Sequence, residues 1–154
     1  MRWLTRKAFR FANRIRRVYW YVVRPQRWGI KVLLVSGKKV VLVRHSYSGG
    51  WNLPGGGFNP KREQPENAAR RETRQELGVD LCEITELGRY DSTAEYKRDT
   101  VICFLGRLRS DQLDPSAEID AAQWFSQDDL PSGLATAART ALQLWNDREG
   151  GRPG

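Results

Sequence analysis

The sequence has little of the residues that most often build redox or zinc centres. Its 154 residues include two cysteines, Cys82 and Cys103, and one histidine, His45. Two cysteines are too few for a disulfide framework, and each lies among apolar neighbours, so we expect buried, unreactive thiols. With so few Cys and His residues, a structural zinc site is close to excluded. A Ser–His–Asp hydrolase would depend entirely on His45, which follows an expected strand end without a nearby nucleophile motif, and it is not favoured.

Acidic residues are missing from the first 62 positions, which contain fifteen Lys and Arg. The remaining 92 residues hold eleven basic residues and all eighteen acidic ones, so the two parts carry formal charges of +15 and −7. This asymmetry indicates a polyanionic partner for the front part, such as phosphate, nucleic acid or anionic lipid. Any carboxylate chemistry must begin at Glu63.

Long hydrophobic runs are also missing. The longest early apolar run, residues 18–23, has six residues, whereas a membrane-spanning helix needs roughly 20. Arginines interrupt residues 1–24 and argue against a secretory signal, although an Arg-rich, acid-free start resembles an organelle transit peptide. We expect a cytoplasmic protein, with peripheral contact to the inner membrane face and an organelle location as further options.

Residues 2–24 predict an amphipathic helix. Apolar residues recur at steps of four and three and share one face, while most arginines fall on the others. Pro25 ends the helix. The apolar face docks either on the protein's own core or on a membrane surface or partner. We expect three parts: a basic N-terminal helix over residues 1–25, a domain over residues 26–148 and a flexible tail over residues 149–154.

The pattern changes to short β-branched runs from Trp28 onward. Residues 30–35 and 40–43 predict a hairpin, and residues 81–90, 100–108 and 122–125 predict further strands. Helices are predicted over residues 65–77 and 131–147, with Pro65 in the first turn of the earlier one and Gly78 at its end. Residues 48–57 are predicted to contain glycine-rich loops. This irregular alternation predicts an α/β fold in which helices cover a mixed sheet.

The helix over residues 65–77 carries the most informative side chains. Ala69, Thr73 and Leu77 form an apolar stripe, and Glu72, Gln75 and Glu76 project together on an adjacent face. A cation between the two carboxylates would relieve their repulsion, and oxygen donors suit Mg²⁺ or Mn²⁺. A solvated Glu/Arg surface explains the helix alone better. The three glycines at 55–57, whose bare backbone can approach a ligand or metal, shift the balance toward a metal site.

These residues together resemble the Nudix box. The pattern is Gly57-x5-Glu63-x7-Arg71-Glu72-Thr73-x-Gln75-Glu76-x-Gly78-Val79, preceded by a Trp-x-Leu-Pro-Gly-Gly segment that is also common in the family. The resemblance implies an α/β/α sandwich with a mixed sheet. It also implies Mg²⁺- or Mn²⁺-dependent hydrolysis of a nucleoside diphosphate linked to another group.

The resemblance also implies roles for individual residues. Glu76 matches a metal ligand, and Glu72 matches a carboxylate that helps to bind metal or takes the proton of the attacking water. A loop glycine carbonyl completes the metal shell, and we assign it to Gly55. Arg71 is expected to hold the loop by pairing with Glu63. The other assignments are Gln75 and Glu118 as metal ligands, Arg44, Tyr96 and Arg98 as contacts to phosphate or base, and Gly57 and Gly78 as structural positions.

Three positions depart from the family pattern. Gln75 replaces a second metal-binding glutamate and removes a negative charge. The loop before Glu63 is one residue longer than usual and lacks its usual final glycine, which leaves open which carbonyl faces the metal. Thr73 replaces an aliphatic residue. The alternative function is therefore a catalytically weakened Nudix domain that binds a nucleotide as a sensor or regulatory module.

The Nudix box does not specify the substrate. Nucleotide sugars, ADP-ribose, dinucleoside polyphosphates and oxidised nucleoside triphosphates all remain open. An RNA 5′ end is compatible with the basic front part, but the interleaved stacking aromatics of an RNA-binding module are not evident. We expect a small nucleotide as the partner.

Overall fold

The computed structural model describes residues 27–92 and 99–150. The predicted helix over residues 2–24, the candidate substrate contacts Tyr96 and Arg98, and residues 151–154 lie outside these ranges. The proposed division into a basic N-terminal helix, a domain and a tail therefore stays a prediction.

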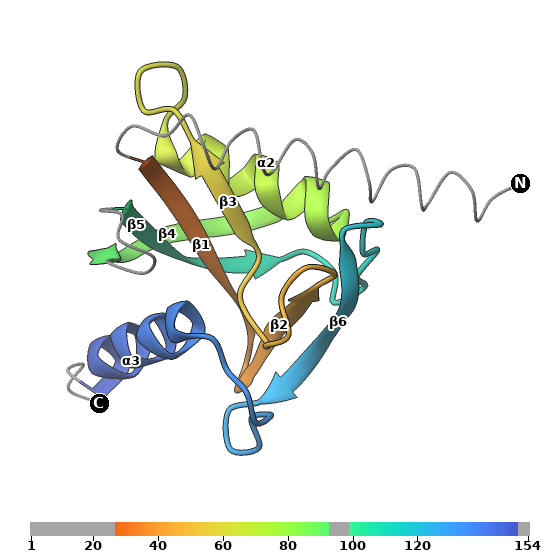
Figure 1. Ribbon diagram of the computed structural model, residues 1–154. Helices are drawn as coiled ribbons and strands as arrows, with labels where there is room; N and C mark the ends of the chain where they lie inside the picture. Colours follow the sequence, from red (N-terminus) through yellow and green to blue (C-terminus); the bar gives the residue numbers. More distant parts are fainter. Residues whose placement is uncertain (1–26, 93–98, 151–154) are drawn as a thin grey trace, which may run out of the picture.

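In residues 27–92 and 99–150, six strands form a single sheet (Figure 1). The sheet is mixed, as the sequence predicts. They are β1 (Arg27–Ser36), β2 (Lys39–His45), β3 (Gly55–Phe58), β4 (Leu81–Ser92), β5 (Asp99–Leu108) and β6 (Ile119–Ser126). The order is β4-β5-β1-β2-β6, and β3 pairs with the first half of β1. β1 is parallel to β5, and the other pairs are antiparallel. The glycine stretch that the sequence suggested as a loop is thus partly a strand.

The predicted hairpin joins β1 to β2. Ser36 pairs with Lys39, which leaves a two-residue turn, and Gly37 has φ 56°. Such turns favour glycine because a positive φ is strained for residues with a Cβ. After β2 the chain turns back, and Asn52 of the glycine-rich segment pairs with Val43 of β2.

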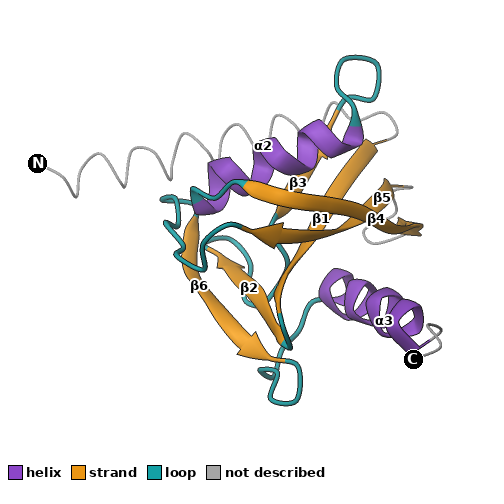
Figure 2. Cartoon of the chain, turned by 180° about the vertical axis from the view of Figure 1, so that it is seen from behind, coloured by secondary structure: helices purple, strands orange, loops and turns teal. Residues whose placement is uncertain are grey.

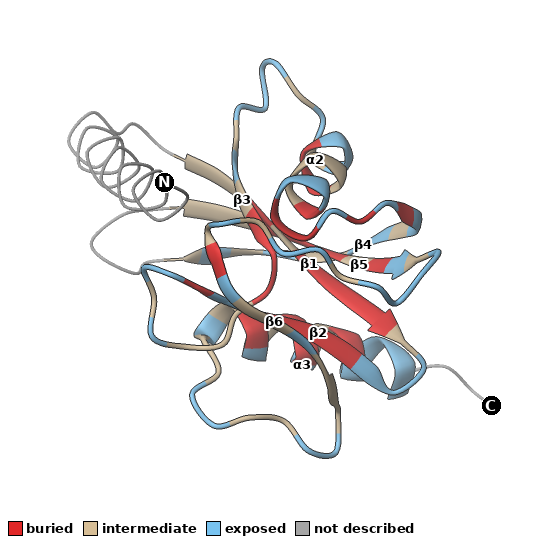
Figure 3. Ribbon diagram, turned by 90° about the vertical axis from the view of Figure 1, so that its right-hand side faces the viewer, coloured by how far each residue is buried: buried red, intermediate tan, exposed pale blue. Residues whose placement is uncertain are grey.

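Two helices cover the two faces of the sheet (Figures 1 and 2). They are α2 (Pro65–Leu77) and α3 (Thr136–Gly150). Alternate residues of β1 serve the two layers: Ile30, Val32 and Leu34 belong to the core beneath α2, whereas Leu33 and Val35 belong to the core beneath α3. Buried positions accordingly concentrate on β1 and β2 (Figure 3). This is the predicted α/β/α sandwich, and neither described helix is long and apolar enough to span a membrane.

The boundaries of α2 follow from its sequence. Pro65 occupies the first turn with Glu66, and Gly78 ends the helix with φ 63°, its N–H bonded to the carbonyl of Arg74. Ala69, Thr73 and Leu77 are all buried against the sheet. The Thr73 hydroxyl donates a hydrogen bond to the Ala69 carbonyl at 3.0 Å, so this polar substitution leaves no unsatisfied group in the core.

Helix α3 starts five positions later than predicted. Residues 131–135 are not helical, and Leu134 forms an isolated parallel bridge with Trp51 in the segment before β3. Trp51 N–H donates to the Gly133 carbonyl at 3.0 Å, and Ala135 N–H donates to the Trp51 carbonyl at 2.7 Å. Gly133 has φ 78°, which breaks helical geometry at that residue. The prediction was wrong here because a tertiary contact overrides local helix propensity.

The two cysteines differ in burial. Cys103 is fully buried, and burial raises the pKa of its thiol to about 11, so the prediction of an unreactive thiol holds for this residue. Cys82 is exposed, and its predicted burial was wrong. It lies on the outer strand β4 next to buried Leu81, and successive side chains of a strand point to opposite faces.

Candidate active site

Glu76 is a buried carboxylate at which three elements meet. It comes from the last turn of α2 and is 6% exposed. Its Oε1 lies 3.0 Å from His45 Nε2 at the end of β2, and its Oε2 accepts a hydrogen bond from Gly55 N–H of β3 at 3.2 Å. With the ring proton on Nε2, His45 donates this hydrogen bond to the Glu76 carboxylate. Each oxygen of Glu76 therefore has one donor from a different strand.

Glu72 lies one turn earlier on the same helix and is half-buried. Arg71 Nη1 donates to its Oε1 at 2.6 Å. Burial raises the pKa of Glu72, Arg71 opposes this shift, and repulsion from Glu76 and Glu118 adds to it. The three carboxylates thus lie within electrostatic range of one another, and the Glu118 backbone is held there by Ser46 N–H at 3.0 Å.

Arg71 links the helix to the preceding loop. Its Nε and Nη2 donate to the two carboxylate oxygens of Glu63 at 2.9 and 3.0 Å. This two-point contact lowers the pKa of Glu63 and raises that of Arg71. Arg71 Nη1 also contacts Gln75 Oε1 at 3.3 Å. The expected Arg71–Glu63 pair is present, and one guanidinium orders Glu63, Glu72 and the exposed Gln75.

The three consecutive glycines have different steric surroundings. A Cβ on Gly55 would lie 2.1 Å from the Ile30 carbonyl oxygen, and a Cβ on Gly56 would lie 2.7 Å from the carboxyl carbon of Glu72. The nearest atom to a Cβ on Gly57 would be the Trp28 carbonyl oxygen, at 3.7 Å, an ordinary contact. Gly57, the formal start of the box, is therefore the least restricted of the three. The close approach to the carboxylates is made by Gly55 and Gly56.

The sequence analysis did not assign two residues near the carboxylates to the site. One is His45; its signal was its position at the end of a strand that leads into the glycine-rich segment. The other is Lys31, a half-buried residue of β1 whose Nζ donates to the Leu53 carbonyl at 3.3 Å. Burial lowers the pKa of Lys31, and attraction to Glu76 is the largest effect opposing that shift. Lys31 pairs in register with Gly55, a neighbour that the sequence order does not reveal.

Of the remaining predicted residues, Arg44 and Gly78 lie within the part of the chain that the structure describes. Arg44 is exposed and its guanidinium lies 5.3 Å from the centre of the Trp51 ring, and Trp51 packs on the core beneath α3. The expected contact of Arg44 with phosphate or base stays a prediction. Gly78 acts as the cap of α2 described above.

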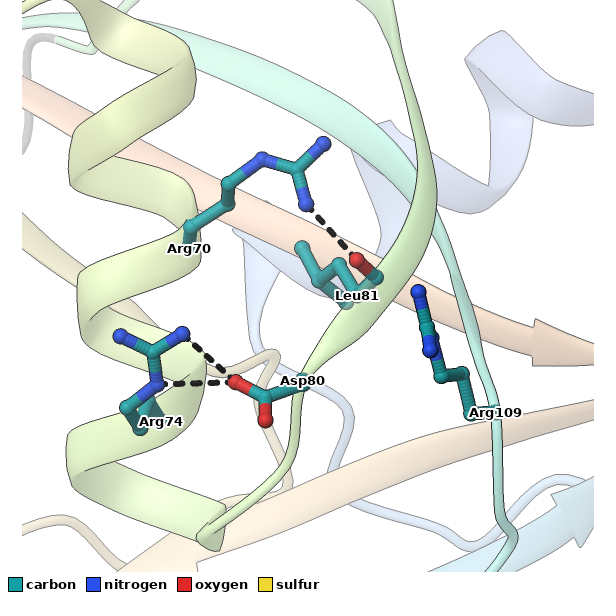
Figure 4. Close-up of a pocket in the computed structure, with 5 residues that line it drawn as sticks. All are labelled: Arg70, Arg74, Asp80, Leu81 and Arg109. Carbon is teal, nitrogen blue, oxygen red and sulfur yellow. Dashed lines mark hydrogen bonds and ion pairs between the residues drawn. The ribbon is translucent and has the colours of Figure 1, made fainter.

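A surface pocket of about 320 Å³ lies on a different side of α2 (Figure 4). Arg70 Nη1 donates to the Leu81 carbonyl at 2.7 Å, and Arg74 is paired with Asp80 at 2.6 Å. Arg109 completes the lining. None of the predicted catalytic or metal-binding residues lines this pocket, so it is separate from the carboxylate cluster.

Comparison with known proteins identifies the family. The NUDIX domain model matches residues 25–145, and the chain belongs to this family. A MutT NUDIX hydrolase from Burkholderia pseudomallei is 30% identical, with a TM-score of 0.69 over 79% of this chain and 98% of that chain. An ADP-ribose pyrophosphatase from Streptococcus suis is 28% identical, with a TM-score of 0.65 over 84% of this chain and 94% of that chain.

A UDP-X diphosphatase is 25% identical, with a TM-score of 0.70 over 85% of this chain and 66% of that chain. A search of curated proteins finds no match. Family and fold together make this chain a Nudix hydrolase, an enzyme of the class that acts on pyrophosphate bonds.

Proposed function

We propose that this chain hydrolyses the pyrophosphate linkage of a nucleoside diphosphate derivative and requires Mg²⁺ or Mn²⁺. One observation carries the proposal: Glu72 and Glu76 lie on one face of α2, and the backbone of Gly55 and Gly56 packs against both carboxylates. This arrangement concentrates negative charge and backbone polar groups in a small volume beside the sheet.

The donor set fits a hard divalent cation. The carboxylate and amide side chains proposed as ligands offer oxygen atoms, and repulsion from Glu76 and Glu118 contributes to the raised pKa of Glu72. In residues 27–92 and 99–150, no three His, Cys, Asp or Glu side chains are grouped closely enough to hold a metal by themselves. Mg²⁺ commonly binds through one or two carboxylates together with substrate phosphates, and Glu72 and Glu76 supply two carboxylates.

Glu72, Glu76 and the Gly55 carbonyl are the proposed ligands, with Gln75 and Glu118 as further oxygen donors. When bound, the cation would neutralise charge on the diphosphate and acidify the attacking water. Glu76 is held by two donors, so its carboxylate plane is set before substrate arrives. Arg71 contacts Oε1 of Glu72, which leaves Oε2 to bind metal or to accept the proton of the water.

Two neighbours guide the choice of substrate. One is named an ADP-ribose pyrophosphatase and the other a UDP-X diphosphatase. We therefore propose ADP-ribose and UDP-linked compounds as the first substrates to test. Dinucleoside polyphosphates and oxidised nucleoside triphosphates complete the panel.

Turnover of this panel with Mg²⁺ or Mn²⁺ tests the proposal. Glu72→Gln and Glu76→Gln should each reduce kcat by about 10²-fold or more, because each removes a charge that organises the transition state. Glu66→Gln is the matched control, since Glu66 lies on the same helix but is exposed and paired only with Arg70. Near-native activity in both Gln variants would refute the assignment of catalysis to these residues.

The same panel decides between an enzyme and a nucleotide sensor. The sensor alternative rests on Gln75, which replaces a charged ligand with a neutral one. Tight binding of a nucleotide without turnover, measured by calorimetry and product analysis, would favour the sensor. Metal-dependent turnover favours the hydrolase.

A further inference from the structure

His45 is a buried residue to which the proposed function assigns no chemical step. It is 3% exposed, and its Nε2 lies 3.0 Å from Glu76 Oε1. The two residues are 31 positions apart and come from β2 and α2. A contact between two buried polar side chains of different elements restricts both of them, because breaking it would leave unsatisfied groups in the interior.

The His45 ring stacks on a neighbouring ring, and the His45 backbone is also held in place. Tyr47 stacks on it, with ring centres 5.0 Å apart and an interplanar angle of 29°. The His45 carbonyl accepts a hydrogen bond from Ser48 N–H at 3.1 Å. The pairing of β2 with β6 changes register between Arg44 and His45, and such irregularities redirect a side chain. His45 is therefore a fixed donor, which distinguishes it from a mobile surface residue.

A fixed donor has a specific effect on Glu76. A glutamate side chain has three rotatable bonds, and a single hydrogen bond from Gly55 would still allow its carboxylate to turn. Donors on both oxygens, from two strands, define the carboxylate plane. Glu72 receives its donor from Arg71 within the box, whereas both donors of Glu76, His45 and Gly55, precede the box.

We infer that His45 is a positioning residue that orients the Glu76 carboxylate toward the metal and substrate. This inference rests on the proposed function for the role of Glu76. Hydrogen-bond partners of metal ligands set ligand orientation, and their loss commonly weakens metal affinity or activity by about 10–100-fold. His45 acts through Glu76 and makes no direct contribution to the chemistry.

Two amides of different length test the inference in the full chain. His45→Gln can place an N–H donor near Glu76 Oε1, whereas the side chain of His45→Asn is one methylene shorter and falls short. We expect His45→Asn and His45→Phe to weaken Mn²⁺ binding, measured by water-proton relaxation without substrate, by about 10-fold or more. His45→Gln should stay within about 3-fold of the native chain by the same principle. Lys39→Ala, exposed at the far end of β2, is the control.

Melting curves establish that each variant is folded at the assay temperature. If His45→Phe fails to fold, the comparison of the two amides decides the question. Native Mn²⁺ affinity in folded His45→Asn would overturn the inference, as would equal weakening in both amides. With saturating Mn²⁺, the loss in His45→Asn should appear in kcat with KM within about 3-fold of native, since the substrate-binding groups are unchanged.

A measurement without metal separates this inference from the proposed function. The chain has a single histidine, so the imidazole ¹⁵N spectrum of the untagged protein reports only on His45. We expect the Nε2–H form in the native chain and a changed Nε2 shift in Glu76→Gln. An Nδ1–H form, or a spectrum insensitive to Glu76→Gln, overturns the inference. If the native chain binds no Mn²⁺ and turns over no nucleotide, the proposed function fails, and the ¹⁵N spectrum still decides whether His45 orients Glu76.

Discussion

We expect Gly56→Ala to remove most of the hydrolase activity without unfolding the protein. The added Cβ would lie 2.7 Å from the carboxyl carbon of Glu72 and 2.8 Å from both of its oxygens. Comfortable contacts between carbon atoms begin at about 3.5 Å. The atoms in the way form the end of a flexible side chain, so the carboxylate moves and the backbone stays in place.

The size of that movement sets the size of the effect. The Glu72 carboxylate must withdraw by about 1 Å, the difference between the present separation and an ordinary contact. A withdrawal of this size would stretch the 2.6 Å contact with Arg71 toward the distance at which a hydrogen bond no longer exists. A misplacement of about 1 Å in a reacting group can cost about 10²-fold in rate. We expect a fall of this order in kcat.

The neighbouring glycines provide matched controls. Gly57→Ala should be active and as stable as the native chain or slightly more so, because its Cβ meets nothing closer than 3.7 Å and alanine restricts the unfolded chain. Gly55→Ala should be the least stable of the three, since its Cβ would lie 2.1 Å from a backbone oxygen of β1. We thus expect Gly56→Ala to be folded and inactive, Gly57→Ala to be folded and active, and Gly55→Ala to be unstable.

The assay combines melting temperature with kcat and the Mg²⁺ concentration at half-maximal rate. Gly56→Ala should melt within a few degrees of the native chain while losing activity. The reasoning is refuted if Gly56→Ala keeps more than about a third of the native kcat, far above the ~10²-fold loss expected. The reasoning is also refuted if Gly57→Ala is the inactive variant. That result would mean that activity requires a glycine at the formal first position of the box.

Further predictions concern the charge of the site, the chemistry, acid stability and the N-terminus. Gln75→Glu should lower the Mg²⁺ concentration needed for half-maximal rate, because it restores a negative charge; an unchanged metal titration would contradict this. Hydrolysis in ¹⁸O-labelled water should place the label on a phosphate product, and label on a non-phosphate product would exclude attack at phosphorus. Arg71 lowers the pKa of Glu63 below its ordinary value of 4.5, so the pair stabilises the fold above that pH and loses its contribution as the pH falls through the lowered pKa. Melting curves of the native chain and Glu63→Gln should therefore differ at pH 7 and converge toward pH 3. Because of residues 2–24, the full chain should sediment with acidic vesicles at low salt, and added salt should release the protein from the vesicles. A chain beginning at Pro25 should stay folded and in the supernatant, and unfolding of that chain would indicate that the helix docks on the core.

The sequence by itself determined the helix that carries the carboxylates. Pro65 and Gly78 bound α2, and the spacing of four between Ala69, Thr73 and Leu77 places one face on the sheet. These features are local, since helix caps and side-chain periodicity depend on residues within one or two turns. The strands other than β3 were predictable for the same reason, because alternation and turn residues act over a few positions.

Only the tertiary structure decided how the carboxylates are held. His45 reaches Glu76 across 31 positions, and Lys31 comes to lie opposite Gly55 through strand pairing. The demand for glycine at 55 and 56 arises from atoms of Ile30 and Glu72, which no local pattern connects to them. Long-range packing determines which side chain meets which backbone atom. The spacing of the box could therefore identify the ligand helix, while the donors and close contacts that orient its glutamates became apparent only when three elements of the fold were brought together.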